Sequence, residues 1–236
     1  MKRFYSSNIS QTLAILEGKE KDHCIKVLRT QLGEKVEIVD GKGNLFIGEL
    51  VNAGKNTADI NIIDKVEEAE RKPFLTIVCC IPKNASRWET FLEKSTEIGV
   101  KRIIPLIAKR SEKSNVRKER NEQILVSAFK QSGHLFLPEL QEPKKFKEVL
   151  LSLKDANHDL FIAHCDEQHK EFLGNSYKKG EEALILIGPE GDFTPEEINL
   201  AIKSNFKPVS LGSSRLRVET AGIVAAGIVS CINELN

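Results

Sequence analysis

Two turns in this sequence carry residue types that can hold and orient a small molecule. The first reads LIGPEGDFTPEE (186–197) and combines two glycines with four carboxylates. Its second half has the pattern of a helix start, in which Thr194 is the N-cap, Pro195 occupies the first helical position and Glu197 completes a capping box. The apolar residues before the turn predict a strand. The turn therefore joins the end of a strand to the start of a helix.

This composition argues against a phosphate-bearing ligand at the first turn. Phosphates bind helix N-termini through free N–H groups and a positive field, but Pro195 lacks an N–H and the carboxylates make the field negative. The chain also contains no GxGxxG and no GxxxxGK[ST] motif, so a nucleotide-dependent enzyme is not expected. A cationic, phosphate-free cofactor such as S-adenosylmethionine fits better at the carboxyl end of a sheet. The alternative is a capped strand–helix turn that binds nothing.

The second turn reads SLGSSRLRVETAG (210–222) and again connects an expected strand to an expected helix. Glu219 falls in or just before the first helical turn, where the helix dipole favours a carboxylate. Arg215 and Arg217 alternate with Leu216, so one of the two arginines can point toward a bound ligand. The alternative is a solvated, arginine-rich turn.

A basic segment spans residues 101–120, which contain eight Lys or Arg and two Glu. The whole chain is nearly neutral, with a net charge of +1 at pH 7, so this segment concentrates positive charge locally. Contact with a polyanion such as RNA or DNA requires a local patch of this kind. The alternative is an ordinary solvated helix surface.

The N-terminal part of the chain, residues 1–72, looks rich in β-structure and ends in the charged run EEAERK (67–72), which predicts a linker. Strands separated by Gly and Asn turns are expected at 35–40, 45–53 and 57–66, and one helix is expected at 20–31. Short strands broken by such turns predict a small barrel or sandwich.

From residue 73 onward, apolar strands alternate with amphipathic helices. Strands are expected at 74–81, 102–108, 159–165, 182–188 and 205–212. Helices are expected at 86–99, near 118–132, after Thr194 and at 218–232. The alternation predicts an α/β domain with a mostly parallel sheet covered on both faces. The last helix is apolar nearly all round and rich in small residues, which indicates a core helix that can also form a subunit interface.

The five cysteines show no CxxC pair and no zinc-ligand spacing, so no metal site is expected. Reduced thiols suit a cytoplasmic protein. Cys79 and Cys80 lie in one expected strand, where neighbouring side chains point to opposite faces. The N-terminal residues contain no apolar signal region. The longest apolar stretch, near residues 221–232, is too short to span a membrane.

Eight segments of the sequence resemble those of one enzyme family. In chain order they are HCIKVLR (23–29), DGKGN (40–44), the turn around Lys83, EKSTEIGV (93–100), KRS (109–111), KQSG (130–133), IGPEGDF (187–193) and LGSSRLRVETA (211–221). Their order and spacing resemble those of RsmE-type small-subunit ribosomal RNA uracil-N3 methyltransferases of the SPOUT class. The resemblance covers essentially the whole chain, and its last two segments are the most specific.

The resemblance implies an α/β fold in two domains. Residues 1–72 would form a PUA-like RNA-binding β-barrel, and residues 73–236 a SPOUT methyltransferase domain whose parallel sheet carries a C-terminal trefoil knot. The implied activity is S-adenosylmethionine-dependent methylation of N3 of a specific uridine in 16S ribosomal RNA. The implied assembly is a cytoplasmic homodimer with composite sites and no membrane partner.

The resemblance also implies site residues. Cofactor contacts are expected for Gly188, Pro189, Glu190, Gly191, Leu211, Gly212, Leu216, Arg217 and Thr220. RNA contacts are expected for His23, Arg29, Lys83 and Arg110, and the charge of the basic segment adds Arg117 and Lys118. For catalysis we expect Arg217 to stabilise or orient the uracil anion and Glu219 to shape its turn.

Three residues depart from the family pattern. Asp192 stands where glycine is common, Lys130 where glutamate is common, and His134 where arginine is common. A non-glycine residue disfavours a positive φ, so Asp192 is expected to alter the turn. Two other hypotheses stay open: a SPOUT methyltransferase for a different RNA nucleotide, and a non-catalytic RNA-binding module.

Overall fold

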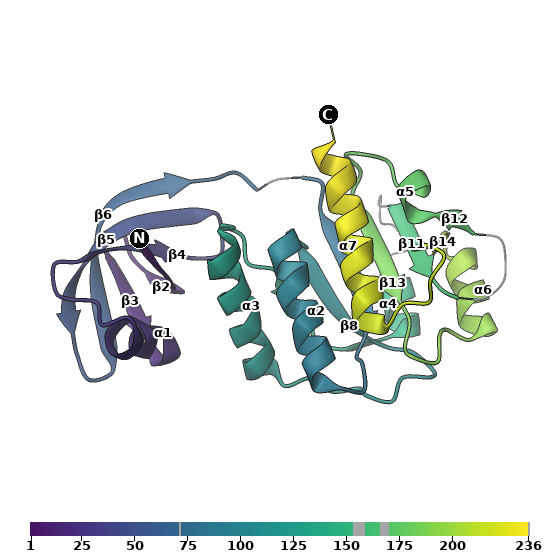
Figure 1. The fold of residues 1–236 in the computed structure, drawn as a ribbon, viewed down its shortest axis with the longest axis horizontal. Helices are drawn as coiled ribbons and strands as arrows, with labels where there is room; N and C mark the ends of the chain where they lie inside the picture. Colours follow the sequence, from purple (N-terminus) through teal and green to yellow (C-terminus); the bar gives the residue numbers. More distant parts are fainter. Residues whose placement is uncertain (71, 153–158, 166–169, 236) are drawn as a thin grey trace. The chain divides into compact units, whose positions relative to one another are not determined.

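The computed structural model describes residues 1–70, 72–152, 159–165 and 170–235 (Figure 1). The chain divides into two compact units. The first contains residues 1–70 together with 126–137, and the second contains the described residues of 71–125 and 138–236. Residues 126–137 lie within the range expected for the second domain, yet they pack with the first unit.

The first unit is built on a six-stranded sheet with the order β1-β4-β5-β6-β3-β2. Its strands are β1 (Lys2–Tyr5), β2 (Asn8–Ile9), β3 (Leu13–Glu17), β4 (Lys35–Val39), β5 (Asn44–Ala53) and β6 (Thr57–Glu67). The last three confirm the expected strands, and the first three were not predicted. Alternating side chains of these strands form a closed apolar core that includes Phe4, Leu16, Ile38, Leu50 and Ile60.

The predicted helix over 20–31 was wrong after residue 27. α1 (Gly18–Asp22) continues into a π-helical turn, η1 (His23–Val27), and the helix ends there. The N–H of Leu28 donates at 2.9 Å to the carbonyl five residues earlier, so the turn is wider than an α-turn and rotates the following side chains. Arg29 then adopts a left-handed backbone with φ 48°.

An ion pair explains Lys130, one of the three departures from the family pattern. Lys130 Nζ lies 2.6 Å from Glu20 Oε1, and both side chains are largely buried, at 13% and 19% exposure. The second oxygen of Glu20 accepts a hydrogen bond from the Tyr5 N–H at 2.9 Å. Lys130 therefore joins the segment 126–137 to α1 and β1 within the first unit.

The second unit is built on an eight-stranded sheet, in which every pairing between described strands is parallel, as predicted. The main order is β10-β8-β7-β13-β11-β14-β12, with β9 beside β8. The strands are β7 (Leu75–Cys80), β8 (Arg102–Ile107), β9 (Glu139–Leu140), β10 (Lys144–Lys145), β11 (Asp159–Ala163), β12 (Glu171–Phe172), β13 (Ala183–Ile187) and β14 (Lys207–Ser210). The five longer strands match the five expected ones.

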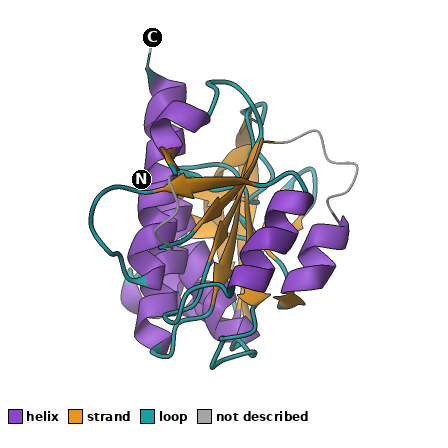
Figure 2. Cartoon of the chain, turned by 90° about the vertical axis from the view of Figure 1, so that its right-hand side faces the viewer, coloured by secondary structure: helices purple, strands orange, loops and turns teal. Residues whose placement is uncertain are grey.

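Helices cover both faces of this sheet (Figure 2). The helices of the chain after residue 73 are α2 (Ala85–Ile98), α3 (Lys118–Ser132), α4 (Phe146–Ser152), α5 (Leu173–Ser176), α6 (Pro195–Lys203) and α7 (Val218–Glu234). One face carries α4 and α6, whose Phe146 and Ile198 pack in the same cluster as Cys80. Cys79 points to the opposite face, where α7 lies against β7 and β13 and α2 lies against α7. That face is tightly packed, because a Cβ on Gly222 would meet the Phe91 ring at 2.5 Å.

Among the described residues, no helix is long and apolar enough to cross a membrane.

Candidate active site

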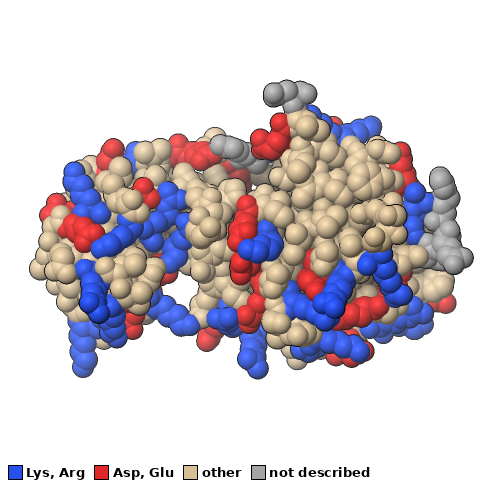
Figure 3. Space-filling model, viewed as in Figure 1, with Lys and Arg blue, Asp and Glu red and all other residues tan. Residues whose placement is uncertain are grey.

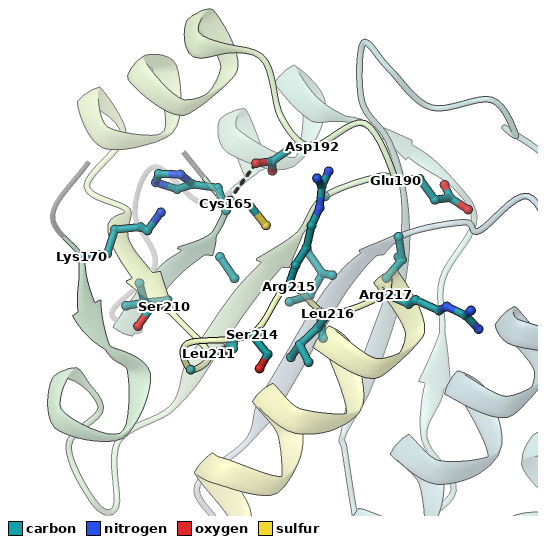
Figure 4. Close-up of a pocket in the computed structure, with 18 of the residues that line it drawn as sticks. Cys165, Lys170, Glu190, Asp192, Ser210, Leu211, Ser214, Arg215, Leu216 and Arg217 are labelled. Carbon is teal, nitrogen blue, oxygen red and sulfur yellow. Dashed lines mark hydrogen bonds between the residues drawn. The ribbon is translucent and has the colours of Figure 1, made fainter. Parts of the chain in front are cut away.

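Three neighbouring strands of the second unit end beside one cavity. In the sheet order, β11 lies between β13 and β14, and all three run parallel, so their carboxyl ends meet at one edge. The loops that leave these strands enclose a cavity of about 680 Å³. Figure 4 shows the residues that line it. Open parallel sheets bind ligands at this edge.

Most of the expected cofactor residues line this cavity. They are Gly188, Pro189, Glu190, Leu211, Gly212, Leu216 and Arg217. Gly212 has φ 130°, a backbone that favours glycine. The structure therefore brings together the two turns that the sequence singled out, 186–197 and 210–222.

A third wall of the cavity was not predicted. It is formed at the end of β11 by Ala163, His164 and Cys165, and further along by Lys170. The signal was present in the sequence, because 159–165 is an expected strand of the same parallel sheet. The carboxyl end of such a strand must lie at the same edge as the other two.

Three of the predicted cofactor and catalytic residues lie outside the described lining: Gly191, Glu219 and Thr220. The Gly191 carbonyl accepts a hydrogen bond from Arg110 Nη1 at 2.7 Å. Glu219 falls in the first turn of α7, as expected, but it is buried and pairs with Arg87 Nε at 3.6 Å. Its carboxylate therefore lies outside the described lining, and the expected shaping role stays a prediction.

The two arginines of the second turn point in different directions. In Figure 4 the Arg215 side chain extends toward Asp192, whereas the Arg217 side chain is directed away from Cys165 and Lys170. Both arginines line the cavity. Arg217 is also the N-cap residue of α7, so the helix fixes its backbone. The site therefore has two guanidinium groups that can meet different parts of a substrate.

The carboxylates of the acidic turn accept hydrogen bonds from backbone N–H groups of three other strand ends. Glu190 Oε1 accepts from Lys83 N at 2.9 Å, after β7. Glu197 Oε1 accepts from Lys109 N at 2.8 Å, after β8. Asp192 Oδ2 accepts from Cys165 N at 2.8 Å, after β11. The acidity of the turn therefore holds the edge of the sheet together, in addition to its effect on charge near the cavity.

The predicted capping box is confirmed. Thr194 Oγ1 accepts from the Glu197 N–H at 3.3 Å, and Glu197 Oε2 accepts from the Thr194 N–H at 3.0 Å. Bonding to the Thr194 side chain also holds the pKa of the exposed Glu196 carboxyl below its usual value. The turn therefore ends in a capped helix start. One oxygen of Glu197 accepts the bond within this cap, and the other accepts the bond from the Lys109 N–H after β8.

Asp192, a departure from the family pattern, takes a positive φ although it is not glycine. Asp192 adopts φ 60°, the left-handed backbone that a glycine would take without strain. Asp is one of the few side chains that tolerate this conformation, because it can hydrogen-bond locally. Its Oδ1 does so by accepting from the Phe193 N–H at 2.8 Å. The backbone path is therefore compatible with glycine, and the aspartate adds bonds to it.

The expected RNA residues occur in both units. In the first unit, His23 begins η1 and is partly buried, and Arg29 is exposed. In the second unit, Lys83 pairs with Glu112 at 2.5 Å, which raises the pKa of Lys83, and Lys118 pairs with Glu142 at 2.9 Å. The other two predicted residues of this unit, Arg110 and Arg117, are also exposed.

The cysteines differ in their environments. Burial raises the pKa of the Cys80 thiol to about 12, although the Ser111 hydroxyl beside it lowers that pKa in part. Burial also raises the pKa of Cys79 well above its usual value. These two thiols are therefore protonated and unreactive at neutral pH. Cys165 is exposed and lines the cavity.

Comparison with known families identifies the class of this site. The sequence model of a family described as the RNA methyltransferase domain matches residues 70–230, and that of the RNA methyltransferase PUA domain matches residues 16–63. The chain belongs to the RNA methyltransferase family. The strand–turn–helix site described above lies within the matched range of its methyltransferase domain.

Individual RNA methyltransferases agree with this assignment. The Ribosomal RNA small subunit methyltransferase E of Synechocystis is 30% identical over 216 residues, which cover 89% of this chain and 70% of that protein. The structure of the enzyme of that name from Neisseria gonorrhoeae, bound to S-adenosyl methionine, is 28% identical with a TM-score of 0.84, covering 96% of this chain and 95% of that one. The structure of a probable rRNA-methyltransferase from Porphyromonas gingivalis is 33% identical with a TM-score of 0.90, covering 99% and 98%.

The acidic turn generates a stability prediction. Glu197→Ala removes the acceptor of two backbone N–H groups, those of Lys109 and Thr194. We expect the free energy of unfolding, measured by urea denaturation, to fall by about 1–3 kcal/mol, because two backbone donors, one of them partly buried, lose a charged acceptor. The matched control is Glu196→Ala, since Glu196 is 77% exposed and lies 3.9 Å from Lys109 Nζ. The fall for Glu196→Ala is expected to be much smaller than the fall for Glu197→Ala, because an exposed ion pair contributes little to stability. Equal losses in the two variants would contradict the proposed role of Glu197.

Proposed function

We propose that this chain transfers the methyl group of S-adenosylmethionine to N3 of a specific uridine in small-subunit (16S) ribosomal RNA. The observation that carries the proposal is the cavity at the carboxyl ends of β11, β13 and β14, formed by the two motif-bearing turns of an RNA methyltransferase domain. The Neisseria relative of the same fold was solved with S-adenosyl methionine bound. The matched PUA domain supports an RNA substrate.

The lining of the cavity fits this cofactor. Its volume of about 680 Å³ lies within the range of roughly 300–1,000 Å³ that is usual for small-molecule sites. Its apolar side chains, Ile187, Val209, Leu211 and Leu216, suit the faces of an adenine ring. Serine hydroxyls and glycine backbone groups suit ribose hydroxyls, and the carboxylates Glu190 and Asp192 offset positive charge. The residues present can therefore hold an adenosine that carries a sulfonium and an ammonium group.

When bound, the cofactor supplies a methyl group activated by the sulfonium. The protein's contribution is to hold the uracil edge in line with that methyl, and positioning of this kind can lower the barrier by roughly 7–11 kcal/mol in favourable cases.

The N3 proton of uridine must leave before or during attack, so negative charge develops on the uracil ring. Arg217 is placed at the N-cap of α7, where its guanidinium stabilises or orients that anion. The ion pair between Glu219 and Arg87 supports the start of α7, which follows the turn. The target uridine must be unpaired or flipped out, because N3 is paired in a duplex.

The role of Arg217 generates a test of the function. Arg217→Ala should bind S-adenosylmethionine within about threefold of wild type by calorimetry, while single-turnover methyl transfer to 16S RNA falls by about 10²–10³-fold. Wild-type transfer by this variant would refute the assignment. A larger loss in Arg215→Ala than in Arg217→Ala would move the role to Arg215.

Cofactor binding and methyl transfer by the wild-type protein distinguish the proposal from two other hypotheses, a non-catalytic RNA-binding module and a methyltransferase for a different RNA nucleotide. If the wild-type protein does not bind the cofactor, the chain is better described as an RNA-binding module. If it methylates RNA but not at uridine N3, as located by mass spectrometry of digested RNA, the chain acts on a different nucleotide.

We also propose that the basic residues of the second unit bind RNA phosphates, with His23 and Arg29 contributing from the first unit. Lys83, Arg110, Arg117 and Lys118 are exposed cations near the carboxyl ends of β7 and β8 or at the start of α3. Figure 3 shows Lys and Arg interspersed with Asp and Glu rather than forming one uniform field. The RNA contact is therefore expected to depend on particular residues.

The charge proposal can be tested by salt dependence. Reversing the charge of Arg117 and Lys118 to Glu should weaken RNA binding and reduce the slope of log K against log salt by about 0.7–0.9 for each lost phosphate contact. Lys203→Glu is the control, because Lys203 is exposed at the end of α6, away from the basic segment. An unchanged slope in the double variant would remove this segment from the RNA footprint.

We further propose that the enzyme is a cytoplasmic homodimer with composite sites, that residues 1–72 form its RNA-binding domain, and that the C-terminal part of residues 73–236 forms a trefoil knot. The insertion of β13 between β7 and β11, which both precede it in the chain, supports an interwoven topology.

One side of α7 carries residues that suit a dimer contact. Three residues on this side, at spacings of four and three, are partly or fully exposed: Val224, Ile228 and Cys231. The surface over α7 is largely uncharged (Figure 3). An apolar helix face of this kind suits contact with a second copy of the chain.

The dimer proposal can be tested on α7. Ile228→Arg should shift the protein to a monomer in sedimentation velocity and lower methyl transfer, because a buried charge in an interface is costly. Ile202→Arg is the matched control, since Ile202 is 39% exposed on α6. A wild-type protein that is monomeric and fully active would contradict the dimer with composite sites.

A further inference from the structure

Asp192 occupies a backbone conformation that favours glycine. Its φ is 60°, and its N–H donates to the Pro189 carbonyl at 2.9 Å, which closes a tight turn directly after β13. A side chain in this region carries a conformational cost that glycine avoids. We therefore expect hydrogen bonds of the Asp192 carboxylate to offset this conformational free energy.

Both carboxylate oxygens of Asp192 accept hydrogen bonds from backbone N–H groups. Oδ1 accepts from Phe193 N and Oδ2 accepts from Cys165 N, each at 2.8 Å. The first bond is local and stabilises the turn. The second connects residues 27 positions apart and reaches a different wall of the cavity, as the dashed line in Figure 4 shows.

The bond to Cys165 lies where the two strands separate. The parallel ladder between β11 and β13 ends at the pair Ala163 and Ile187. Beyond that pair the chains diverge into the loops that line the cavity on either side, with Cys165 on one wall and Gly188 and Pro189 on another. Asp192 therefore continues the connection between β11 and β13 past the end of the ladder, at the mouth of the ligand site.

We propose that Asp192 is a positioning residue that clips the end of β11 to the turn after β13 and thereby sets the spacing of two walls of the cofactor cavity. The inference rests on the proposed function, because it assumes that this cavity binds S-adenosylmethionine. With both oxygens engaged by backbone amides, the side chain acts on the shape of the cavity and leaves the reacting atoms to other residues. The expected consequence is a large effect on cofactor affinity and a small effect on turnover at saturating cofactor.

Three substitutions at residue 192 distinguish the effect of losing the carboxylate from the effect of straining the backbone. Asp192→Gly removes the carboxylate and keeps the positive φ without strain. Asp192→Asn keeps one acceptor oxygen and tolerates the same backbone. Asp192→Ala removes the carboxylate and adds the strain. Glu196→Gln is the control, because it neutralises an exposed carboxylate of the same turn that does not line the cavity. Thermal unfolding of each variant confirms that it is folded at the assay temperature.

The first measurement is the dissociation constant of S-adenosylmethionine, determined by calorimetry. We expect Asp192→Gly and Asp192→Ala to weaken binding roughly tenfold to a hundredfold, which is the usual range for a lost charged hydrogen bond. Asp192→Asn should recover part of the affinity, and Glu196→Gln should match wild type. At saturating cofactor, methyl transfer by Asp192→Gly should remain within about threefold of wild type, whereas a catalytic group would lower it much further.

The second measurement needs no cofactor. Amide hydrogen exchange of Cys165 should be faster in Asp192→Gly than in wild type, because the N–H loses its acceptor. The inference is overturned if wild type binds the cofactor and Asp192→Gly binds it equally well, or if Cys165 exchange is unchanged. It is also overturned if Asp192→Ala loses affinity while Asp192→Gly does not, since backbone strain would then explain the effect. A wild-type protein that does not bind S-adenosylmethionine refutes the proposed function and the inference together.

Discussion

The active-site edge of the second unit depends on one type of interaction: a carboxylate of the acidic turn accepting a backbone N–H from another strand end. Glu190, Asp192 and Glu197 make such bonds to the ends of β7, β11 and β8. Parallel strands have no hairpin turns that could fix where their loops go, so the loops at this edge need side-chain bonds to hold them. A charged acceptor provides about twice the strength of a neutral one. One turn thus holds the loops that follow three other strands of the sheet.

This arrangement changes how the charge of the turn should be understood. Four carboxylates beside a ligand cavity suggest an electrostatic preference for cations, and that preference agrees with a sulfonium cofactor. In the structure, however, three of those carboxylates also accept hydrogen bonds from backbone N–H groups of other loops. Part of their negative charge is therefore neutralised by these N–H dipoles. Charge and geometry are consequently coupled in this turn. A substitution that removes one of these charges also releases a loop, and neutral isosteres are needed to separate the two effects.

The basic segment and the acidic turn are likewise connected. Lys109 and Arg110 belong to the segment that the sequence marks as an RNA contact, and both bond to the turn, one through its backbone N–H and one through its guanidinium. Residues expected to meet the substrate therefore help to hold the loop expected to meet the cofactor. Helix α7 combines roles in a similar way. Arg217, which lines the cavity, is its N-cap, Glu219 lies in its first turn, and its length provides both packing against α2 and an uncharged outer face.

Much of the fold and part of the site follow from local sequence patterns. The parallel sheet is confirmed, because the alternation of strands and helices along the chain predicts it. The capping box at Thr194 and the placement of Glu219 in the first turn of α7 are also confirmed, because each depends on residues that are neighbours in the chain. The helix over 20–31 was wrong after residue 27 because a π-helical turn depends on packing within the first unit, which periodicity does not report. The strands β1, β2 and β3 were not predicted.

The residue types available at the site, the strand–turn–helix form of both turns and the family resemblance can all be read from the sequence. The contacts between these residues depend on the folded arrangement of the strands. Glu190 finds Lys83 at a separation of 107 residues, and Asp192 finds Cys165 at a separation of 27. The wall at the end of β11 and the exclusion of Gly191, Glu219 and Thr220 from the described lining are also results of packing. The physical reason is that strand order sets these neighbours, and strand order is a property of the whole sheet rather than of any one segment.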